Sequence, residues 1–191
     1  MEDDEAGMKT ASVYDALNRM TRAWNSKGQE SDYFYNGLGQ RLGRTINGEE
    51  EDYHLDLSKP YHNLLGIRKG DSRQNFYFDN NVSVIEEEGN PHYYLQDELG
   101  SPLRISGYGA GKETADIRNE YLTYGYDEFG NDLYKELEEA GIPCPYDRQG
   151  EEQPFGYTGY RFDDVSGTYF AQAREYQVGN GRFTAEDLLI I

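Results

Sequence analysis

Short runs of aromatic and apolar residues alternate with polar turns, and this alternation predicts strands over most of the chain. The clearest runs are residues 33–35, 76–78, 103–105 and 121–126. Runs this short, bounded by Gly, Asn and Asp, are typical of strands rather than helices. Only residues 132–140 have a helical pattern, because Asn131 can cap its start and Gly141 can end it. We predict a mainly β fold with one short helix near 132–140.

One phrase recurs along the chain. Tyr14-Asp15-Ala16-Leu17-Asn18 returns 21 residues later as Tyr35-Asn36-Gly37-Leu38-Gly39. Looser copies begin at Tyr94 and Tyr126. Each combines an aromatic residue, Asp or Asn, an apolar anchor and Gly or Asn, and we expect a tight turn with positive φ values at Asn36-Gly37. A repeat of this period indicates stacked modules, so we predict one continuous antiparallel sheet.

The acidic charge limits what the chain is expected to bind. Its net charge is −18, with 36 acidic residues against 18 Lys and Arg. Phosphate backbones require clustered basic groups, so we expect no nucleic-acid partner. Acidic runs such as 49–52 and 86–88 are interpreted as solvated loops. Calcium binding is the alternative, although the chain has no Asp-x-Asp-x-Asp-Gly loop.

Other catalytic or ligand-binding patterns are weak. Cys144 lies between two prolines with no nearby histidine, and residues 107–113 depart from a phosphate-binding loop in spacing. The histidines, which show no metal-binding spacing, are His54, His62 and His92. We therefore expect no metal and no cofactor. No run of 18 or more apolar residues predicts a membrane span, and the acidic start at residues 1–5 is unlike a signal peptide.

The C-terminal part resembles a known family. Residues 154–163, with the sequence PFGYTGYRFD, resemble the opening of the Rhs-repeat-associated core domain. The similarity continues through residues 167–176 (GTYFAQAREY) and 181–183 (GRF), and the Tyr-Asp phrases upstream resemble the YD repeats of Rhs proteins. This resemblance implies a YD/Rhs repeat region at 1–153 and a truncated core domain at 154–191.

The resemblance implies a structural role rather than a ligand-binding site. Rhs proteins wind YD repeats into a hollow β-shell that encloses and delivers a C-terminal toxin, and the core domain closes one end. By this resemblance the chain is a structural shell segment, not itself an enzyme, whose partners are the rest of the shell and its toxin cargo. The implied location is secreted or at the cell surface in the full-length context.

One candidate catalytic residue follows from the same resemblance. In many relatives the core domain cuts its own chain, using an Arg-Asp pair after the Gly-Arg-Phe phrase and a second Asp further on. Asp187 matches the first carboxylate, while Glu186 stands where many relatives have Arg. The second Asp and a cleavage site do not follow within the 191 residues. We therefore expect Asp187 to be a structural turn residue.

A surface-binding role is the alternative function. Tyrosine-rich sheet faces can stack on sugar rings, so the chain is alternatively a cell-surface adhesion or carbohydrate-binding module. Exposed tyrosines would favour this alternative, and buried tyrosines would favour the shell. An open sheet also exposes unpaired edges, from which we expect oligomers or aggregation.

Overall fold

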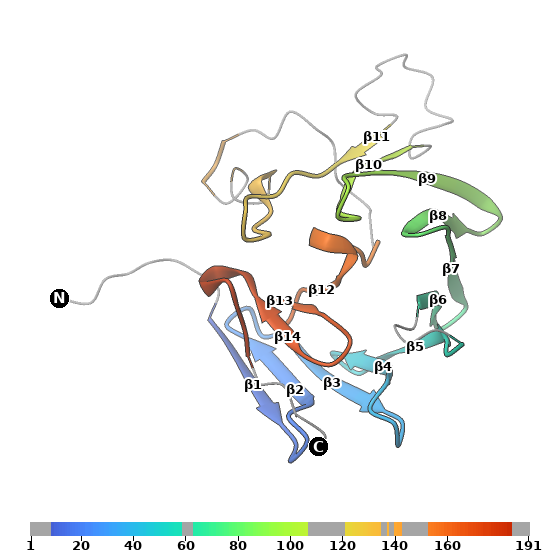
Figure 1. The fold of residues 1–191 in the computed structure, drawn as a ribbon. Helices are drawn as coiled ribbons and strands as arrows, with labels where there is room; N and C mark the ends of the chain where they lie inside the picture. The colour runs from blue at the N-terminus through green and yellow to red at the C-terminus, as the bar shows by residue number, and fades with distance from the viewer. Residues whose placement is uncertain are drawn as a thin grey trace.

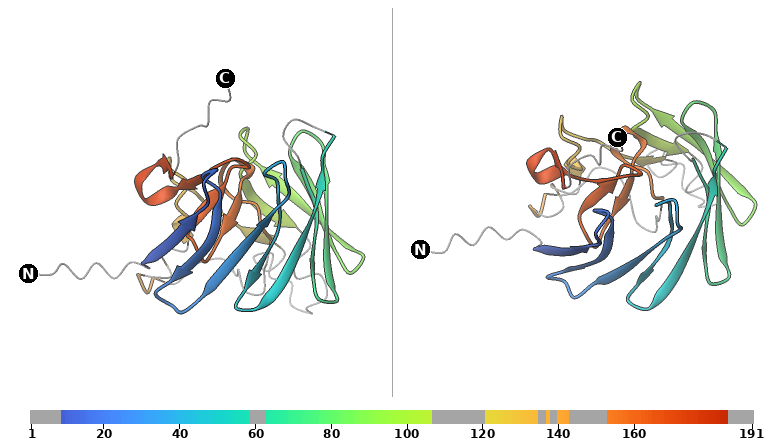
Figure 2. Two further views of the ribbon diagram at one scale, coloured as in Figure 1. Left: turned by 90° about the horizontal axis from the view of Figure 1, so that it is seen from below. Right: turned by 60° about the horizontal axis from the view of Figure 1, so that its bottom comes forward.

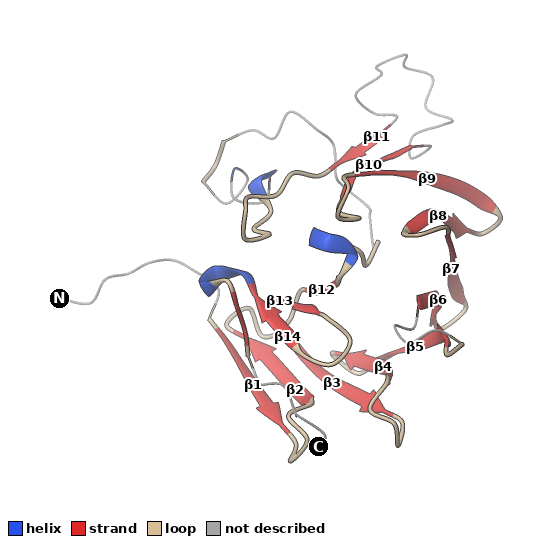
Figure 3. Cartoon of the chain, in the orientation of Figure 1, coloured by secondary structure: helices blue, strands red, loops and turns tan. Residues whose placement is uncertain are grey.

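Two antiparallel sheets form the computed structural model, which describes residues 9–58, 63–106, 121–134, 137, 140–142 and 153–184. The larger is an 11-stranded meander in which each strand pairs with its neighbours in sequence. It curls around a four-stranded sheet from the C-terminal part of the chain (Figures 1 and 3). The chain is therefore mainly β, which confirms the prediction.

The strands are short, and tight or five-residue turns join most of them. The larger sheet contains β1 (Thr10–Tyr14), β2 (Met20–Asn25), β3 (Glu30–Tyr35), β4 (Arg41–Ile46), β5 (Glu49–Asp56), β6 (Asn63–Lys69), β7 (Ser72–Phe78), β8 (Val82–Glu87), β9 (Asn90–Gln96), β10 (Pro102–Ser106) and β11 (Tyr121–Thr123). The smaller sheet contains β12 (Arg161–Asp163), β13 (Thr168–Phe170), β14 (Glu175–Gln177) and β15 (Arg182–Phe183). Two 3-10 turns accompany it, η2 (Tyr157–Gly159) and η3 (Val178–Asn180).

The recurring phrase forms one five-residue turn. An Asp or Asn Oδ1 accepts the backbone N–H groups two and four positions later, and the N–H three positions later donates to its carbonyl. These turns begin at Asp15, Asn36, Asp97 and Asp127. The fourth residue has positive φ, which explains its restriction to Gly or Asn. The predicted positive φ therefore falls at Gly39 (82°) and not at Gly37.

A fifth copy of this turn lies at 25–29, where the sequence analysis missed it. Asn25 Oδ1 accepts the N–H groups of Lys27 and Gln29 at 3.0 and 3.2 Å. Gly28 has φ 80°. Trp24 stands directly before this turn where Tyr stands before Asp15, Asn36 and Asp127, so the available signal was an aromatic residue followed by the Asn-x-x-Gly spacing. Gln96 precedes the copy at Asp97, so the repeat is defined by hydrogen bonding of an Asp or Asn side chain rather than by the preceding aromatic residue.

The predicted helix at 132–140 falls largely outside the described residues. Within it, Leu133, Tyr134 and Leu137 are helical. Asp132 Oδ1, rather than the expected Asn131, accepts the N–H of Tyr134 at 3.0 Å. The Asn131 amide instead donates to the preceding five-residue turn. The capping role therefore belongs to the next residue along.

We expect Asp127→Asn to reduce the amount by which the free energy of unfolding falls between about pH 4 and pH 2. The Asn131 amide donates to Asp127 at 2.7 Å, and this bond and the backbone N–H groups hold the pKa of Asp127 below its ordinary value. A depressed folded-state pKa gives stability that is present above the unfolded pKa, about 4, and is lost as pH falls through the folded value. Urea unfolding between about pH 4 and pH 2 measures the slope. Glu128→Gln, which removes an exposed neighbouring carboxylate, is the control. An unchanged slope in Asp127→Asn would contradict this account.

Candidate functional site

The best-defined site is the buried interface between the two sheets. Its apolar half is built around Phe155, which is 5% exposed and precedes β12. The Phe155 ring meets three rings of the larger sheet edge-on, with centroid separations of 5.1, 5.9 and 6.2 Å to Phe76, Phe78 and Tyr94. Edge-to-face packing of this kind adds stability beyond the buried area. Phe155 therefore anchors the C-terminal segment against the concave face.

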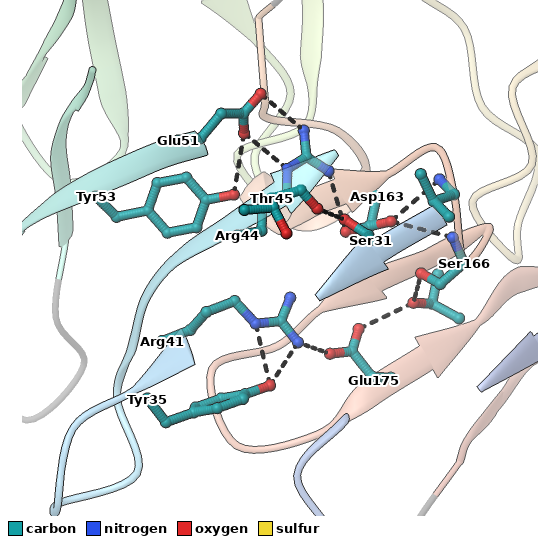
Figure 4. Close-up of polar contacts among 12 residues, drawn as sticks. Ser31, Tyr35, Arg41, Arg44, Thr45, Glu51, Tyr53, Asp163, Ser166 and Glu175 are labelled. Carbon is teal, nitrogen blue, oxygen red and sulfur yellow. Dashed lines mark hydrogen bonds and ion pairs between the residues drawn. The ribbon is translucent and has the colours of Figure 1, made fainter. Parts of the chain in front are cut away.

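The polar half of the interface consists of arginines of β4 and carboxylates of the smaller sheet (Figure 4). Arg41 ion-pairs with Glu175, and both side chains are 3% exposed. Arg41 also donates to Tyr35 Oη at 2.8 Å. Arg44 lies between two carboxylates, with its Nε 2.7 Å from Glu51 and its Nη1 3.1 Å from Asp163. Two buried ion pairs thus connect residues more than 100 positions apart in sequence.

Burial and charge act in opposite directions on the two interface carboxylates. At Asp163, burial acts to raise the pKa, but the charges of Arg44 and Arg41 and its hydrogen bonds outweigh it and lower the pKa. At Glu175, burial prevails and raises the pKa despite the charge of Arg41. Thr168 Oγ1 also donates to Glu175 at 2.9 Å, which satisfies its second oxygen. The smaller sheet therefore brings one firmly ionised carboxylate and one whose charge depends on Arg41.

A third arginine, Arg161, is held by aromatic rings. Its guanidinium carbon lies 4.7 Å from the ring centre of Tyr53 and 4.8 Å from that of Phe170. Phe170 also lies 3.9 Å from the guanidinium carbon of Arg41, so one ring contacts two cations. Burial lowers the pKa of Arg161 to about 10, which leaves it charged at neutral pH. Cation–π contacts of this type are strongest where water is excluded.

The last five-residue turn is held by tyrosines of the C-terminal segment. Three successive backbone carbonyls accept three phenol hydroxyls: Glu128 from Tyr157 at 3.0 Å, Phe129 from Tyr176 at 3.0 Å, and Gly130 from Tyr169 at 3.2 Å. A side chain at the fourth turn position would collide, since an added Cβ would lie 2.6 Å from the Tyr157 ring. The requirement for Gly here is thus both conformational and steric.

Together these contacts form a docking interface in which Arg41 and Arg44 pair with carboxylates and Arg161 lies against aromatic rings. The sequence analysis did not find this site. Arg41 and Arg44 are three positions apart, so strict alternation places them on opposite faces of the strand. The register shift between Phe34 and Tyr35 brings both arginines to the inner face, and the sequence gives no signal for this shift.

Of the candidate catalytic and metal-binding residues named in the sequence analysis, only His54 and His92 are among the described residues. Asp187 and Glu186 lie outside the described residues, as do His62, Cys144 and 107–113. His54 is exposed on β5, and His92 is half-buried on β9. Across the described ranges, no three His, Cys, Asp or Glu side chains are grouped to hold a metal ion. In the same part of the chain, no helix is long and apolar enough to cross a membrane.

Comparison with known proteins places this architecture. The crystal structures of TcdB2-TccC3 and of TcdB2-TccC3-TEV each superpose with a TM-score of 0.58 over 93% of the chain, at 13% and 12% identity. The fold is Rhs-like. The chain spans about 9% of the length of these structures. No family model matches the sequence.

Curated relatives carry an enzymatic name. The chain is 25% identical to the tRNA3(Ser)-specific nuclease WapA of Bacillus spizizenii and 26% identical to the tRNA nuclease WapA of Bacillus subtilis. Each match covers 92% of this chain but only 7% of the relative. The expectation that the protein is not an enzyme is therefore wrong, because the relatives that match it are named nucleases.

Proposed function

We propose that the chain is a wall segment of an Rhs-type β-shell that encloses and delivers a toxin. The observation that carries this proposal is the docked C-terminal segment. A meander that curls, with a smaller sheet locked against its concave face by buried ion pairs, is suited to enclosing a space and closing it. A freestanding sheet would have no need of a fixed inner layer.

The names of the relatives suggest which reaction the toxin catalyses. Because they are named tRNA nucleases, the assembled protein is proposed to belong to a tRNA-cleaving toxin. We also propose that residues 1–153 form a repeat region and residues 154–191 part of a core domain. The proposed location of the full-length protein is secreted or at the cell surface. The rest of the shell and its cargo are the proposed partners.

Side-chain exposure supports a wall over a carbohydrate-binding face. Most described tyrosines are buried or half-buried, and several donate their hydroxyls inside the interface. The exposed ones are Tyr77, Tyr93 and Tyr160. Stacking on sugars would require more open rings than these.

Detection of the native polypeptide tests the wall proposal. An antibody against residues 9–58 is expected to recognise, in the source cells, a polypeptide with a mass far above 21.9 kDa. Limited proteolysis of that polypeptide is expected to leave an internal segment intact until the shell is opened with denaturant. The opened protein, incubated with total tRNA, is expected to cleave it. A monomeric product of about 21.9 kDa with no protected interior would overturn the proposal.

A further inference from the structure

Three Asn-Gly pairs lie in turns of the part of the chain that the structure describes, at 36–37, 47–48 and 180–181. In such a pair the backbone nitrogen of Gly can attack Cγ of the Asn side chain, because Gly has no Cβ to obstruct the approach. The Asn Oδ1 gains negative charge as this bond forms, so N–H groups that already donate to it lower the barrier. Two conditions therefore favour the reaction: an Oδ1 held by N–H groups of the following residues, and a Gly N–H that is not already hydrogen-bonded.

The pair at 36–37 meets both conditions. It lies in the five-residue turn between β3 and β4, at one rim of the larger sheet (Figure 2). Asn36 Oδ1 accepts the N–H groups of Leu38 and Gln40 at 2.9 and 3.0 Å, so the side chain is folded over the residues that follow it. Among the described residues, the N–H of Gly37 has no acceptor, and a Cβ added at Gly37 would meet no atom within 4 Å. The nitrogen that would attack is therefore free.

The pair at 47–48 does not meet the first condition. Asn47 Oδ1 accepts the N–H of Glu30 at 2.9 Å. Glu30 is the first residue of β3, so the Asn47 side chain is directed across the sheet to a neighbouring strand and not over the peptide that follows it. We therefore expect Cγ of Asn47 to lie away from the nitrogen of Gly48.

The pair at 180–181 does not meet the second condition. Asn180 Oδ1 accepts the N–H of Arg182 at 3.1 Å, as the first condition requires. The N–H of Gly181, however, donates to the Val178 carbonyl at 3.1 Å at the end of η3. Attack by this nitrogen would first break that hydrogen bond, which adds to the barrier. Of the three pairs, the one at 36–37 is therefore the most reactive.

We propose that Asn36 is a self-modification site, at which the turn converts its own Asn to Asp and isoaspartate. The Gly37 nitrogen forms a bond to Cγ of Asn36, and the bond from Cγ to Nδ2 breaks. Nδ2, which donates to Gln40 Oε1 at 2.5 Å, leaves as ammonia with the proton that the Gly37 nitrogen gives up. Water then opens the five-membered imide at either of its two carbonyl carbons, which gives Asp or isoaspartate. Water is the only co-reactant, and the site does not depend on the proposed shell.

The two products differ in their effect on the turn. Asp is compatible with it, because Asp is the first residue of three other five-residue turns. Isoaspartate adds a methylene to the backbone, so the spacing that brings the acceptor to the N–H groups two and four positions later is lost. Arg41 follows this turn directly and pairs with Glu175. Isoaspartate at position 36 is therefore expected to weaken docking of the smaller sheet.

Peptide mass spectrometry of the whole chain after incubation at neutral pH tests the site. In the folded chain, Asn36 is expected to deamidate about tenfold or more faster than Asn47 or Asn180. In urea the turns are lost, and the three pairs are expected to react at similar rates because the dipeptide is the same. Labelling by an isoaspartyl methyltransferase identifies the isoaspartate product. Equal rates at the three pairs in the folded chain, or an equal preference for Asn36 in urea, would overturn the inference.

Two substitutions separate the reaction from its effect. Gly37→Ala is expected to slow modification of Asn36 about tenfold, because the methyl group obstructs the attack, and Ala16 shows that Ala fits this turn position. Asn36→Asp supplies the charge without isoaspartate and is the matched control for stability. In urea unfolding, the incubated wild type is expected to unfold at lower urea than fresh Asn36→Asp. An unchanged rate in Gly37→Ala would refute the attack by this nitrogen, and equal unfolding midpoints would refute the effect on docking.

Discussion

Glu175→Ala is expected to lower the free energy of unfolding by about 3–5 kcal/mol, the usual cost of removing one partner from a buried ion pair. The Arg41 guanidinium would remain in a site where both side chains are 3% exposed, with its carboxylate partner gone. Thr168 would lose its acceptor at the same time. Urea unfolding followed by far-UV circular dichroism measures the effect.

An exposed ion pair of the same chemistry serves as the control. Arg68 and Asp52 pair across β5 and β6 with side chains 60% and 40% exposed. Asp52→Ala is expected to destabilise the chain far less than Glu175→Ala, because water screens the exposed pair and solvates the remaining charge. If Glu175→Ala and Asp52→Ala destabilise the chain equally, the interface does not hold the buried pair described here.

A double substitution separates the charge from the packing. In Arg41→Met/Glu175→Leu no charge of this pair is left without a partner, so most of the stability lost in Glu175→Ala is expected to return. Tyr35, which accepts hydrogen bonds from Arg41, still donates to the Met20 carbonyl at 2.8 Å. Recovery would show that the penalty arises from an isolated buried charge.

The sequence was sufficient for the larger sheet because its determinants are local. Each five-residue turn is specified by one Asp or Asn and by Gly or Asn three residues later, within a span short enough to recognise as a repeat. Alternation of side chains between the two faces is not kept at β10. A register shift between Pro102 and Arg104 leaves Leu103 36% exposed while Ile105 is fully buried. Strict alternation would place both side chains on one face of the strand, and the register shift reverses that relation.

The interface could not be predicted because its partners are distant in sequence. Arg41 meets Glu175 across 134 positions, and Arg44 meets Asp163 across 119. Nothing in either segment alone indicates which arginine meets which carboxylate. Resemblance to the core domain predicted a second unit at 154–191, but it did not predict that strands from this segment would lie against β4. Only the curl of the larger sheet brings these residues together.

Phe155→Ala is expected to cost about 3–5 kcal/mol, the usual range for deleting a buried aromatic ring. The substitution would remove three edge-to-face contacts and leave a cavity lined by Phe76, Phe78 and Tyr94. Phe34→Ala, at a side chain 46% exposed, is the matched control and is expected to change stability by no more than about 0.5 kcal/mol.

The form of the unfolding transition distinguishes a lost anchor from general weakening. The only tryptophan, Trp24, lies on β2 in the larger sheet, so its fluorescence follows that sheet, while far-UV circular dichroism follows both sheets. In the wild type the two signals are expected to change together, because the docked segment and the larger sheet share one buried interface. In Phe155→Ala the dichroism is expected to begin changing at lower urea than the fluorescence, since the smaller sheet would leave first. Coincident transitions in Phe155→Ala would show that the ion pairs of β4 alone keep the smaller sheet docked.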